Sequence, residues 1–322
     1  MEPITGAAVD LGSNTFRLLV AKISDQGITS LVKRLVTVRL GKGLSASNVL
    51  DPATEERALR VLADFLAIMG RHRLGFCRAC GTAALRQVAD RSQFLQKAAA
   101  ALGGVAIEVI SGEEEASLTF LGASAALHDA VKFPILLADV GGGSTELVWK
   151  KDSGSLPITA SLPLGAVTLT EQFLRSPIPT EDELGRLRRH IGNILAPAVA
   201  KIGGQATALI GSGGTATSLA ALDLKLERYD EKLIQGYRLS SSRINELFER
   251  LVLLTPEERN FLPGLEEGRG DIIVAGAAIY QEILAITKSG QEMIISDAGL
   301  LEGILLSGFR DVSGQVQRDL CG

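Results

Sequence analysis

The chain has 322 residues, a length that corresponds to about two domains. Hydrophobic residues make up 46% of the sequence and charged residues 22%, with a mean hydropathy of +0.23, which excludes an intrinsically disordered chain and a fibrous protein. The 33 Lys and Arg residues nearly balance the 37 Asp and Glu residues, so the net charge of −4 gives no general attraction to nucleic acid or to an anionic membrane. We expect neither as a partner.

The cysteines and the N-terminus indicate where the protein works. Three cysteines are too few for a disulfide framework and fit a reducing compartment. The N-terminus lacks a basic segment followed by an apolar one, and no uninterrupted apolar run reaches about 18 residues. We therefore expect a cytoplasmic protein. Cys77 and Cys80 have the C-x-x-C spacing, but on a strand they would point to opposite faces, so we expect neither a redox centre nor a zinc site.

The first part of the chain predicts strands followed by alternating helices and strands. Asp51 or Thr54 can cap the first helix, whose apolar residues recur at helical spacing. The expected elements are a hairpin at 6–23, a strand at 28–40, a helix at 52–73, a strand at 76–80, a helix at 91–102 and a strand at 105–110.

The pattern then begins again at residues 133–150. "AVDLGSNTFRLLV" and "LADVGGGSTELVW" both contain Asp, one residue, Gly and a small polar segment that leads into an apolar strand, so Asp10 matches Asp139. Two related α/β halves are indicated, with a boundary near 122–133. The elements expected after the second hairpin are a helix at 180–202, a strand, glycine loop and helix at 208–222, and helices at 240–254 and 270–286.

Three glycine-containing loops are candidates for binding phosphate groups. Glycine lets the backbone approach a ligand closely, and successive N–H groups form a concave anion site. The third loop leads into a helix, whose N-terminal end favours an anion. The loops are Gly12, Ser13, Asn14 and Thr15; Gly141, Gly142, Gly143, Ser144 and Thr145; and Gly211, Ser212, Gly213, Gly214 and Thr215. Each alone is also typical of a structural turn, but together they indicate a substrate with several phosphates.

Acids and arginines near these loops supply the candidate chemistry. Three consecutive glutamates follow Ser111 and Gly112 at an expected helix start, and they form either a solvated first turn or a source of one inward carboxylate that activates water. Asp10, Asp139 and Glu146 could hold Mg²⁺ or bond to turn amides. The arginines that could donate to phosphate oxygens are Arg17, Arg86 and Arg269.

The ordered motifs resemble the exopolyphosphatase/guanosine pentaphosphate phosphohydrolase (Ppx/GppA) family over nearly the whole chain. They are "DLGSNTFRLLV", "GTAALR", "SGEEEASL", "DVGGGSTELV", "GSGGTATSLAAL", "RGDIIVAG" and "SDAGLLEGIL". The resemblance implies an actin-like two-domain fold of the sugar kinase/Hsp70/actin superfamily, a ribonuclease H-like duplication, with the site between domains. We expect domains at 1–122 and 123–322, with a helix around 297–307 packing back on the first.

The resemblance also implies roles for individual residues. Glu115 is the glutamate before the small residue of the motif, which implies the catalytic position, and Glu146 closes "DVGGGSTE", which implies a role in placing metal or water. Asp139 and Gly141 to Thr145 resemble the phosphate and metal loop. Arg86 and Arg269 resemble substrate-anion contacts, and Arg17 falls where some members contact a guanosine polyphosphate.

The same resemblance implies a Mg²⁺-dependent hydrolase of the terminal phosphoanhydride of inorganic polyphosphate, of guanosine pentaphosphate, or of both. Guanosine tetraphosphate is a further expected ligand, and a homodimer is a further expected assembly. The chain looks like the short family form without added helical domains, and the usual "RAD" is here Arg269, Gly270 and Asp271. The alternatives are an ATP-dependent small-molecule kinase of the same superfamily and a sensor that binds these phosphates without turnover.

Overall fold

The computed structural model describes residues 3–24, 27–44, 48–127, 131–202, 206–287 and 292–319, with side chains up to 313 in the last range. The chain divides into two compact units. Unit 1 comprises Met1–Ala125 and Gly299–Gly322, and unit 2 comprises Ala126–Ala298. The expected boundary at 122–133 includes residues 128–130, which lie outside the described residues.

Unit 1 is built on a five-stranded sheet with the order β3-β2-β1-β4-β5. The strands are β1 (Ile4–Leu11), β2 (Thr15–Ser24), β3 (Gly27–Thr37), β4 (Phe76–Gly81) and β5 (Ile107–Val109). β2 lies antiparallel to β1 and β3, whereas β1, β4 and β5 are parallel. The carboxyl ends of β1, β4 and β5 therefore meet at one edge of the sheet.

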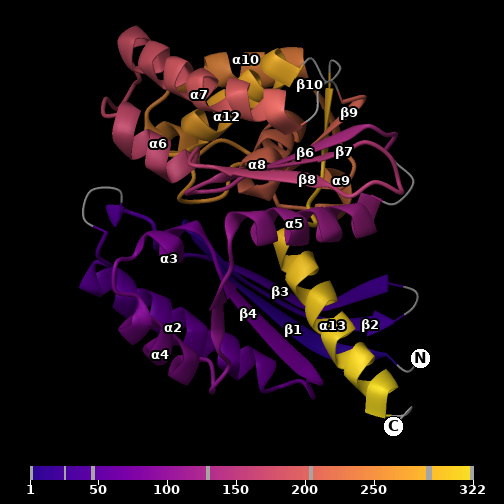
Figure 1. The fold of residues 1–322 in the computed structure, drawn as a ribbon. Helices are drawn as coiled ribbons and strands as arrows, with labels where there is room; N and C mark the ends of the chain where they lie inside the picture. Colours follow the sequence, from indigo (N-terminus) through magenta and orange to yellow (C-terminus); the bar gives the residue numbers. More distant parts are fainter. Residues whose placement is uncertain are drawn as a thin grey trace. The chain divides into compact units, whose positions relative to one another are not determined.

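The helices of unit 1 cover both faces of this sheet (Figure 1). They are α2 (Pro52–Met69), α3 (Ala83–Gln87), α4 (Ser92–Ala101), α5 (Gly112–Leu127) and α13 (Leu300–Asp319). Val9 belongs to the hydrophobic cluster that contains residues of α2 and α4, whereas Ala8 clusters with Leu118 of α5 and Ile304 of α13. Strand side chains alternate, so Asp10 lies on the same face as Ala8.

Unit 2 repeats the same sheet and adds one strand at an edge. Its order is β10-β11-β9-β6-β7-β8. The strands are β6 (Ile135–Val140), β7 (Thr145–Lys150), β8 (Ile158–Leu162), β9 (Ala208–Ser212), β10 (Arg238–Ser240) and β11 (Glu292–Ile295). β6, β9 and β11 are parallel and β6, β7 and β8 are antiparallel neighbours, so β6 to β9 and β11 correspond to β1 to β5. The expected internal duplication is confirmed.

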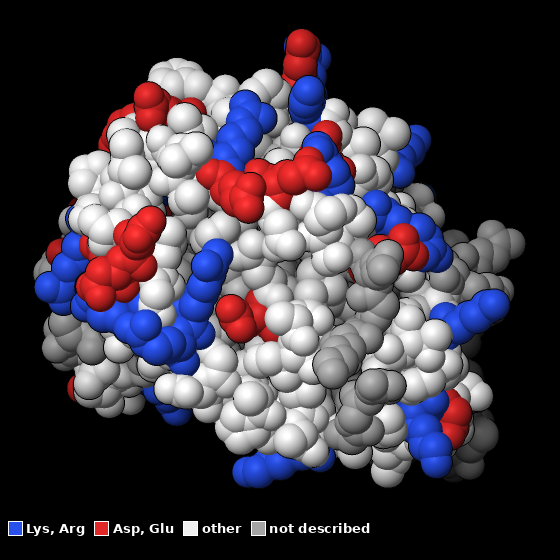
Figure 2. Space-filling view, turned by 90° about the horizontal axis from the view of Figure 1, so that it is seen from above, with Lys and Arg blue, Asp and Glu red and all other residues white. Residues whose placement is uncertain are grey.

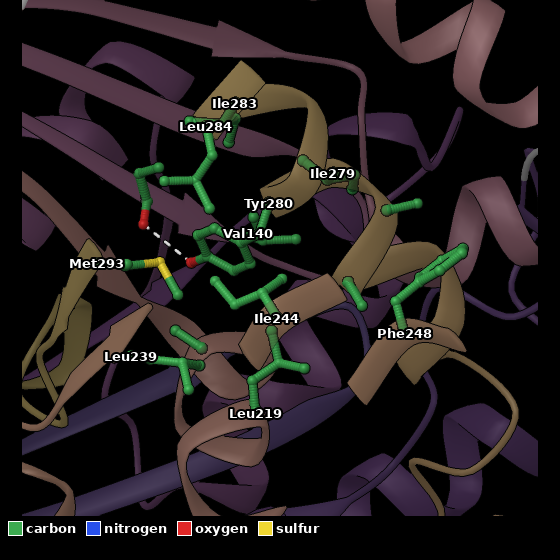
Figure 3. Packing of buried hydrophobic residues seen from close by; sticks show 14 of the residues in the cluster. Val140, Leu219, Leu239, Ile244, Phe248, Ile279, Tyr280, Ile283, Leu284 and Met293 are labelled. Atoms are coloured by element: carbon green, nitrogen blue, oxygen red, sulfur yellow. Dashed lines mark hydrogen bonds between the residues drawn. The ribbon is translucent and has the colours of Figure 1, made fainter. Parts of the chain in front are cut away.

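Helices cover the face of the second sheet that carries Leu136, Ala138 and Val140. The helices of unit 2 are α6 (Ala166–Phe173), α7 (Glu181–Ile202), α8 (Gly213–Leu224), α9 (Glu231–Ile234), α10 (Ser241–Val252), α11 (Pro256–Asn260) and α12 (Ile273–Thr287). Figure 3 shows the tight packing of this cluster. Asp139 lies between Ala138 and Val140 on β6 and therefore belongs to the opposite face.

Several local expectations are confirmed. Asp51 caps α2, since its Oδ2 accepts from Thr54 N at 2.9 Å. Cys77 and Cys80 lie in hydrophobic clusters on opposite faces of the first sheet, and burial raises their pKa values to about 11 and about 12. The helix expected around 297–307 is α13, which packs on the first sheet. No helix in the described ranges is long and apolar enough to cross a bilayer.

The start of α7 provides a stability test. Glu183 and Thr180 form a reciprocal cap, in which Thr180 N donates to Glu183 Oε2 at 2.9 Å and Glu183 N donates to Thr180 Oγ1 at 3.2 Å. The backbone N–H of Thr180 and then those of Arg175 and Ser176 lower the pKa of Glu183 from its ordinary value of 4.5 to about 2.

A lowered carboxyl pKa stabilises the folded state above the unfolded-state pKa, and this contribution is lost as the pH falls through the folded-state pKa. We therefore expect the unfolding free energy of wild type to exceed that of Glu183→Gln at pH 7, with the difference shrinking between about pH 5 and pH 2. Urea unfolding at several pH values measures this. The exposed Glu181→Gln is the control, and a difference for position 183 that does not change with pH would contradict the assignment.

Candidate active site

The turns of the two β hairpins have the same hydrogen-bond pattern. Gly12 N donates to Thr15 O at 3.1 Å, and Gly141 N donates to Ser144 O at 3.0 Å. Asp10 is the register partner of Arg17 in the first hairpin, whereas Asp139 is the register partner of Glu146 in the second. Directly opposed residues share a sheet face, so each turn carries a pair of charged side chains on one face. The first pair is acid and base, and the second pair is two acids.

In unit 1, the first turn holds two buried polar atoms that lack a partner. Asp10 is 1% exposed, and its Oδ2 accepts from Arg17 Nε at 2.8 Å and Nη2 at 2.7 Å. Burial raises the pKa of Asp10, while Arg17 opposes this shift. Asp10 Oδ1 and Asn14 Nδ2 are buried without a hydrogen-bond partner. Such atoms are costly unless a ligand satisfies them, so this turn fits a polar ligand.

A loop that the sequence did not mark holds this turn in place. Val38 N and Arg39 N donate to Asn14 O at 3.0 and 2.8 Å, and Gly41 N donates to Ser13 O at 2.7 Å. The carbonyl groups of the turn are thus bonded to the 38–41 segment. The side of the turn that carries N–H groups and the Asn14 amide is the side left to bind an anion.

Glu115 is the one buried member of the three consecutive glutamates. Ser111 caps α5 by accepting from Glu114 N at 3.1 Å, and the exposed Glu114 pairs with Arg78 at 2.9 Å. Glu115 is 8% exposed, and its Oε2 accepts from Arg86 Nη1 at 2.7 Å. One carboxylate of the acidic run is therefore buried, and the other two are exposed in the first turn of α5.

The residues of unit 1 gather at the carboxyl ends of its parallel strands. Arg86 also donates to Ile110 O at 3.0 Å, just after β5, and Thr82 N donates to Leu11 O at 3.3 Å, joining the ends of β4 and β1. The start of α3 is therefore tied to the strand that carries Asp10, and Arg86 on α3 is tied to Glu115. The expected residues Asp10, Arg17, Arg86 and Glu115 all belong to this edge of one unit.

In unit 2, two acids face each other across β6 and β7. Asp139 and Glu146 are register partners, and both are buried, at 8% and 1% exposed. Ser161 Oγ donates to Glu146 Oε1 at 2.8 Å. Two carboxylates directly opposite each other repel, and a cation bound by both would relieve that repulsion. Their oxygen donors suit Mg²⁺, so the pair fits a divalent cation.

The first unit offers less for a cation. The charge of Asp10 is already compensated by Arg17, so only its Oδ1 remains as a ligand atom. Within the described residues, no group of three or more His, Cys, Asp or Glu side chains is arranged as a metal cage. A cation at Asp139 and Glu146 would therefore need substrate oxygens or water as further ligands, as is usual for Mg²⁺ bound to phosphates.

The second glycine turn packs against the start of α6. Ala166 N donates to Gly141 O at 2.9 Å, and Val167 N donates to Gly142 O at 2.9 Å. Thr145, which was expected to bind phosphate, is fully buried and donates its hydroxyl to Leu164 O at 2.5 Å. The Thr145 side chain therefore holds the 162–166 segment against the turn, because its hydroxyl proton is already committed.

The third glycine segment joins strand to helix directly, because β9 ends at Ser212 and α8 begins at Gly213, whereas a loop over 211–215 was expected. Gly213 has φ of +81°, which is unfavourable for other residues, and a Cβ atom there would collide with Asp139 Oδ1. A Cβ atom at Gly214 would collide with the guanidinium of Arg269, which is 8% exposed. Asp139 and Arg269 therefore lie against successive residues of the first turn of α8. Ser212, the residue before this turn, makes no side-chain capping bond, so the first turn can receive an anion.

Two further contacts tie this loop to β6. Thr215 Oγ1 donates to Val140 O at 3.4 Å. Tyr280 on α12 places its hydroxyl 3.0 Å from Ala138 O and 2.7 Å from Ser212 O, in the apolar cluster of Figure 3. Burial raises the pKa of Tyr280, which keeps this hydroxyl protonated as a donor. In the sequence, Tyr280 is marked by its polar hydroxyl, because the other residues of the first two turns of α12 are apolar.

Several known proteins are similar to this chain over nearly its whole length. "Exopolyphosphatase 2" of Mycobacterium tuberculosis is 33% identical over 313 residues, covering 94% of this chain and 97% of that protein. A putative exopolyphosphatase of Haemophilus influenzae is 29% identical over 304 residues, covering 94% and 90%. The crystal structure of an exopolyphosphatase-like protein, 30% identical, matches with a TM-score of 0.92 and covers 97% of this chain and 100% of that chain.

A Ppx/GppA family member from Aquifex aeolicus has a TM-score of 0.81 at 29% identity, covering 96% of this chain and 98% of that one. A nucleoside triphosphate hydrolase from Neospora caninum, 12% identical with a TM-score of 0.52 over 94% and 92% of the two chains, shares the fold alone. The expected actin-like duplication is thereby confirmed. The model of the Ppx/GppA phosphatase family matches residues 19–311, and the chain belongs to that family.

Proposed function

We propose that this chain is an exopolyphosphatase, which hydrolyses the terminal phosphoanhydride bond of inorganic polyphosphate, guanosine pentaphosphate or both. The observation that carries the proposal is the Glu115 carboxylate, which is buried at the carboxyl edge of the first sheet and held by Arg86 at 2.7 Å. The names of the relatives from Mycobacterium tuberculosis and Haemophilus influenzae support inorganic polyphosphate as the substrate.

In the proposed reaction, a water molecule attacks the terminal phosphorus in line with the anhydride oxygen. Glu115 takes a proton from this water, the new P–O bond forms, and the anhydride P–O bond breaks. The electron pair of the broken bond leaves with the shortened polyphosphate. Arg86 holds the carboxylate in place through Oε2. The orphaned Asn14 Nδ2 is available to a phosphate oxygen.

Unit 2 contributes the groups that balance charge. The N–H groups at the start of α8 and the guanidinium of Arg269 lie together and suit the substrate phosphates. Asp139 and Glu146 would hold Mg²⁺, which when bound would neutralise charge on phosphate oxygens.

A phosphate-release assay on polyphosphate, guanosine pentaphosphate and ATP, each with and without Mg²⁺, tests the proposal. We expect orthophosphate release from at least one of the first two substrates, dependent on Mg²⁺, and little from ATP. Transfer to an organic hydroxyl without free phosphate would instead indicate a kinase. Tight binding of polyphosphate or guanosine tetraphosphate without turnover would indicate a sensor. Either result would contradict hydrolysis as the function.

A further inference from the structure

The short helix α11 holds Gly270, the residue after Arg269, on both sides of its backbone. Gly270 N donates to Asn260 Oδ1 at 2.9 Å, and Gly270 O accepts from Arg259 Nη1 at 2.9 Å. A Cβ atom at position 270 would lie 2.7 Å from Asn260 Oδ1 and would collide with the Pro256 carbonyl oxygen. Both polar groups of this residue are therefore bound by α11, and the close approach requires glycine.

Arg259 is a costly residue to bury. It is 2% exposed and is among the largest fully buried side chains of the described structure. Its Nε donates to Leu251 O at 2.7 Å, and its Nη2 is buried without a hydrogen-bond partner. Burial lowers the pKa of Arg259, and the charge of Asp271 opposes this shift. The two hydrogen bonds of this guanidinium join Leu251 on α10 to Gly270 before α12, so Arg259 fixes the position of the residue after Arg269.

Arg269 directly precedes Gly270, the residue that α11 contacts. Its carbonyl accepts from Ile272 N at 3.1 Å and Ile273 N at 3.0 Å at the start of α12, and its Nε donates to Glu266 Oε2 at 2.5 Å. Its guanidinium lies against Gly214 in the first turn of α8. A small rotation of the peptide between residues 269 and 270 would move the guanidinium at the end of this long side chain away from that turn.

We propose that Arg259 and Asn260 are positioning residues, which fix the Gly270 peptide so that the Arg269 guanidinium stays over the start of α8. The role of Arg269 as a phosphate contact rests on the proposed function. Neither Arg259 nor Asn260 touches the substrate in this account.

Kinetics of Asn260 variants test this clamp, in which Arg259 and Asn260 hold Gly270. Asn260 is exposed, so Asn260→Ala removes the acceptor with little risk to folding. We expect its KM for polyphosphate to rise about fivefold while kcat stays within about twofold of wild type, because one hydrogen bond that orients a binding group is lost. Asn260→Asp keeps an oxygen acceptor and is expected to restore KM. Asn245→Ala, which removes the exposed acceptor of Gln281 on α12, is the matched control.

A double-mutant cycle separates positioning from a general structural effect. In the Arg269→Ala background, Asn260→Ala is expected to cause no further rise in KM, because the group that it positions is absent. Arg259→Lys, which keeps a charge but lacks the guanidinium fork, is expected to raise KM in wild type and not in Arg269→Ala. Additive effects, or a lower kcat with unchanged KM, would overturn the inference.

A readout without substrate keeps the clamp independent of the proposed function. The NMR signal of the Arg269 Nε–H group, assigned by its loss in Arg269→Lys, is expected to exchange with water faster in Asn260→Ala than in wild type or Asn260→Asp. Equal exchange in all three would overturn the clamp. If exchange changes as expected but wild type releases no phosphate, the proposed function is wrong and the clamp stands.

Discussion

Glu115→Gln is expected to lower phosphate release from polyphosphate about a thousandfold, because glutamine keeps the shape of the side chain but cannot accept a proton from water. Its amide oxygen can still accept from Arg86, which donates to Glu115 Oε2 at 2.7 Å in wild type. The binding of polyphosphate is therefore expected to remain within about threefold of wild type, since the substitution removes an interaction of the transition state. Steady-state kinetics and titration calorimetry measure the two quantities.

The neighbouring residue provides the control. Glu114→Gln changes the same functional group one position earlier, where the side chain is exposed and pairs with Arg78. We expect near wild-type turnover for this variant. Equal activities for Glu115→Gln and wild type, with thermal unfolding unchanged, would exclude Glu115 as the base.

Glu146→Gln is expected to lower activity about 10- to 100-fold and to raise the Mg²⁺ concentration for half-maximal activity, because it removes one of two opposed carboxylates. Asp139 and Glu146 are register partners in unit 2, whereas Glu115 belongs to unit 1. A loss of turnover in this variant therefore also tests whether both units serve one reaction. Mn²⁺ binding followed by calorimetry supplies a readout that does not depend on turnover, and weaker binding is expected.

Glu249→Gln, an exposed substitution on α10 of the same unit, controls for the change in net charge. If Glu146→Gln binds Mn²⁺ as tightly as wild type and keeps the Mg²⁺ dependence of wild type, the cation does not use this carboxylate.

The sequence allowed the repeated hairpins to be predicted because their signal is local. The spacing from Asp10 to Arg17 equals that from Asp139 to Glu146, and strand alternation then places each pair on one sheet face. The three consecutive glutamates after Ser111 likewise indicated the start of a helix, which the structure has as α5. These features depend on residues within one or two elements, so periodicity and turn chemistry describe them well.

The supports of the site could not be predicted, because they join segments far apart in the chain. Tyr280 reaches the carbonyls of Ala138 and Ser212, and Arg259 reaches Gly270 from a helix of five residues. The 38–41 loop bonds to Ser13 and Asn14 through backbone groups, which leave no pattern in the sequence. The hydroxyl of Thr145 likewise donates to the carbonyl of Leu164, which follows a strand that the sequence pattern did not indicate.

Isotope analysis of a single turnover tests the central claim most directly. Wild-type protein is mixed with less than one equivalent of polyphosphate in water enriched in ¹⁸O, with Mg²⁺ present, and both products are examined by mass spectrometry. Attack of water on the terminal phosphorus predicts one ¹⁸O atom in each released orthophosphate and none in the shortened chain. Label in the shortened chain, or released phosphate without label, would contradict the account.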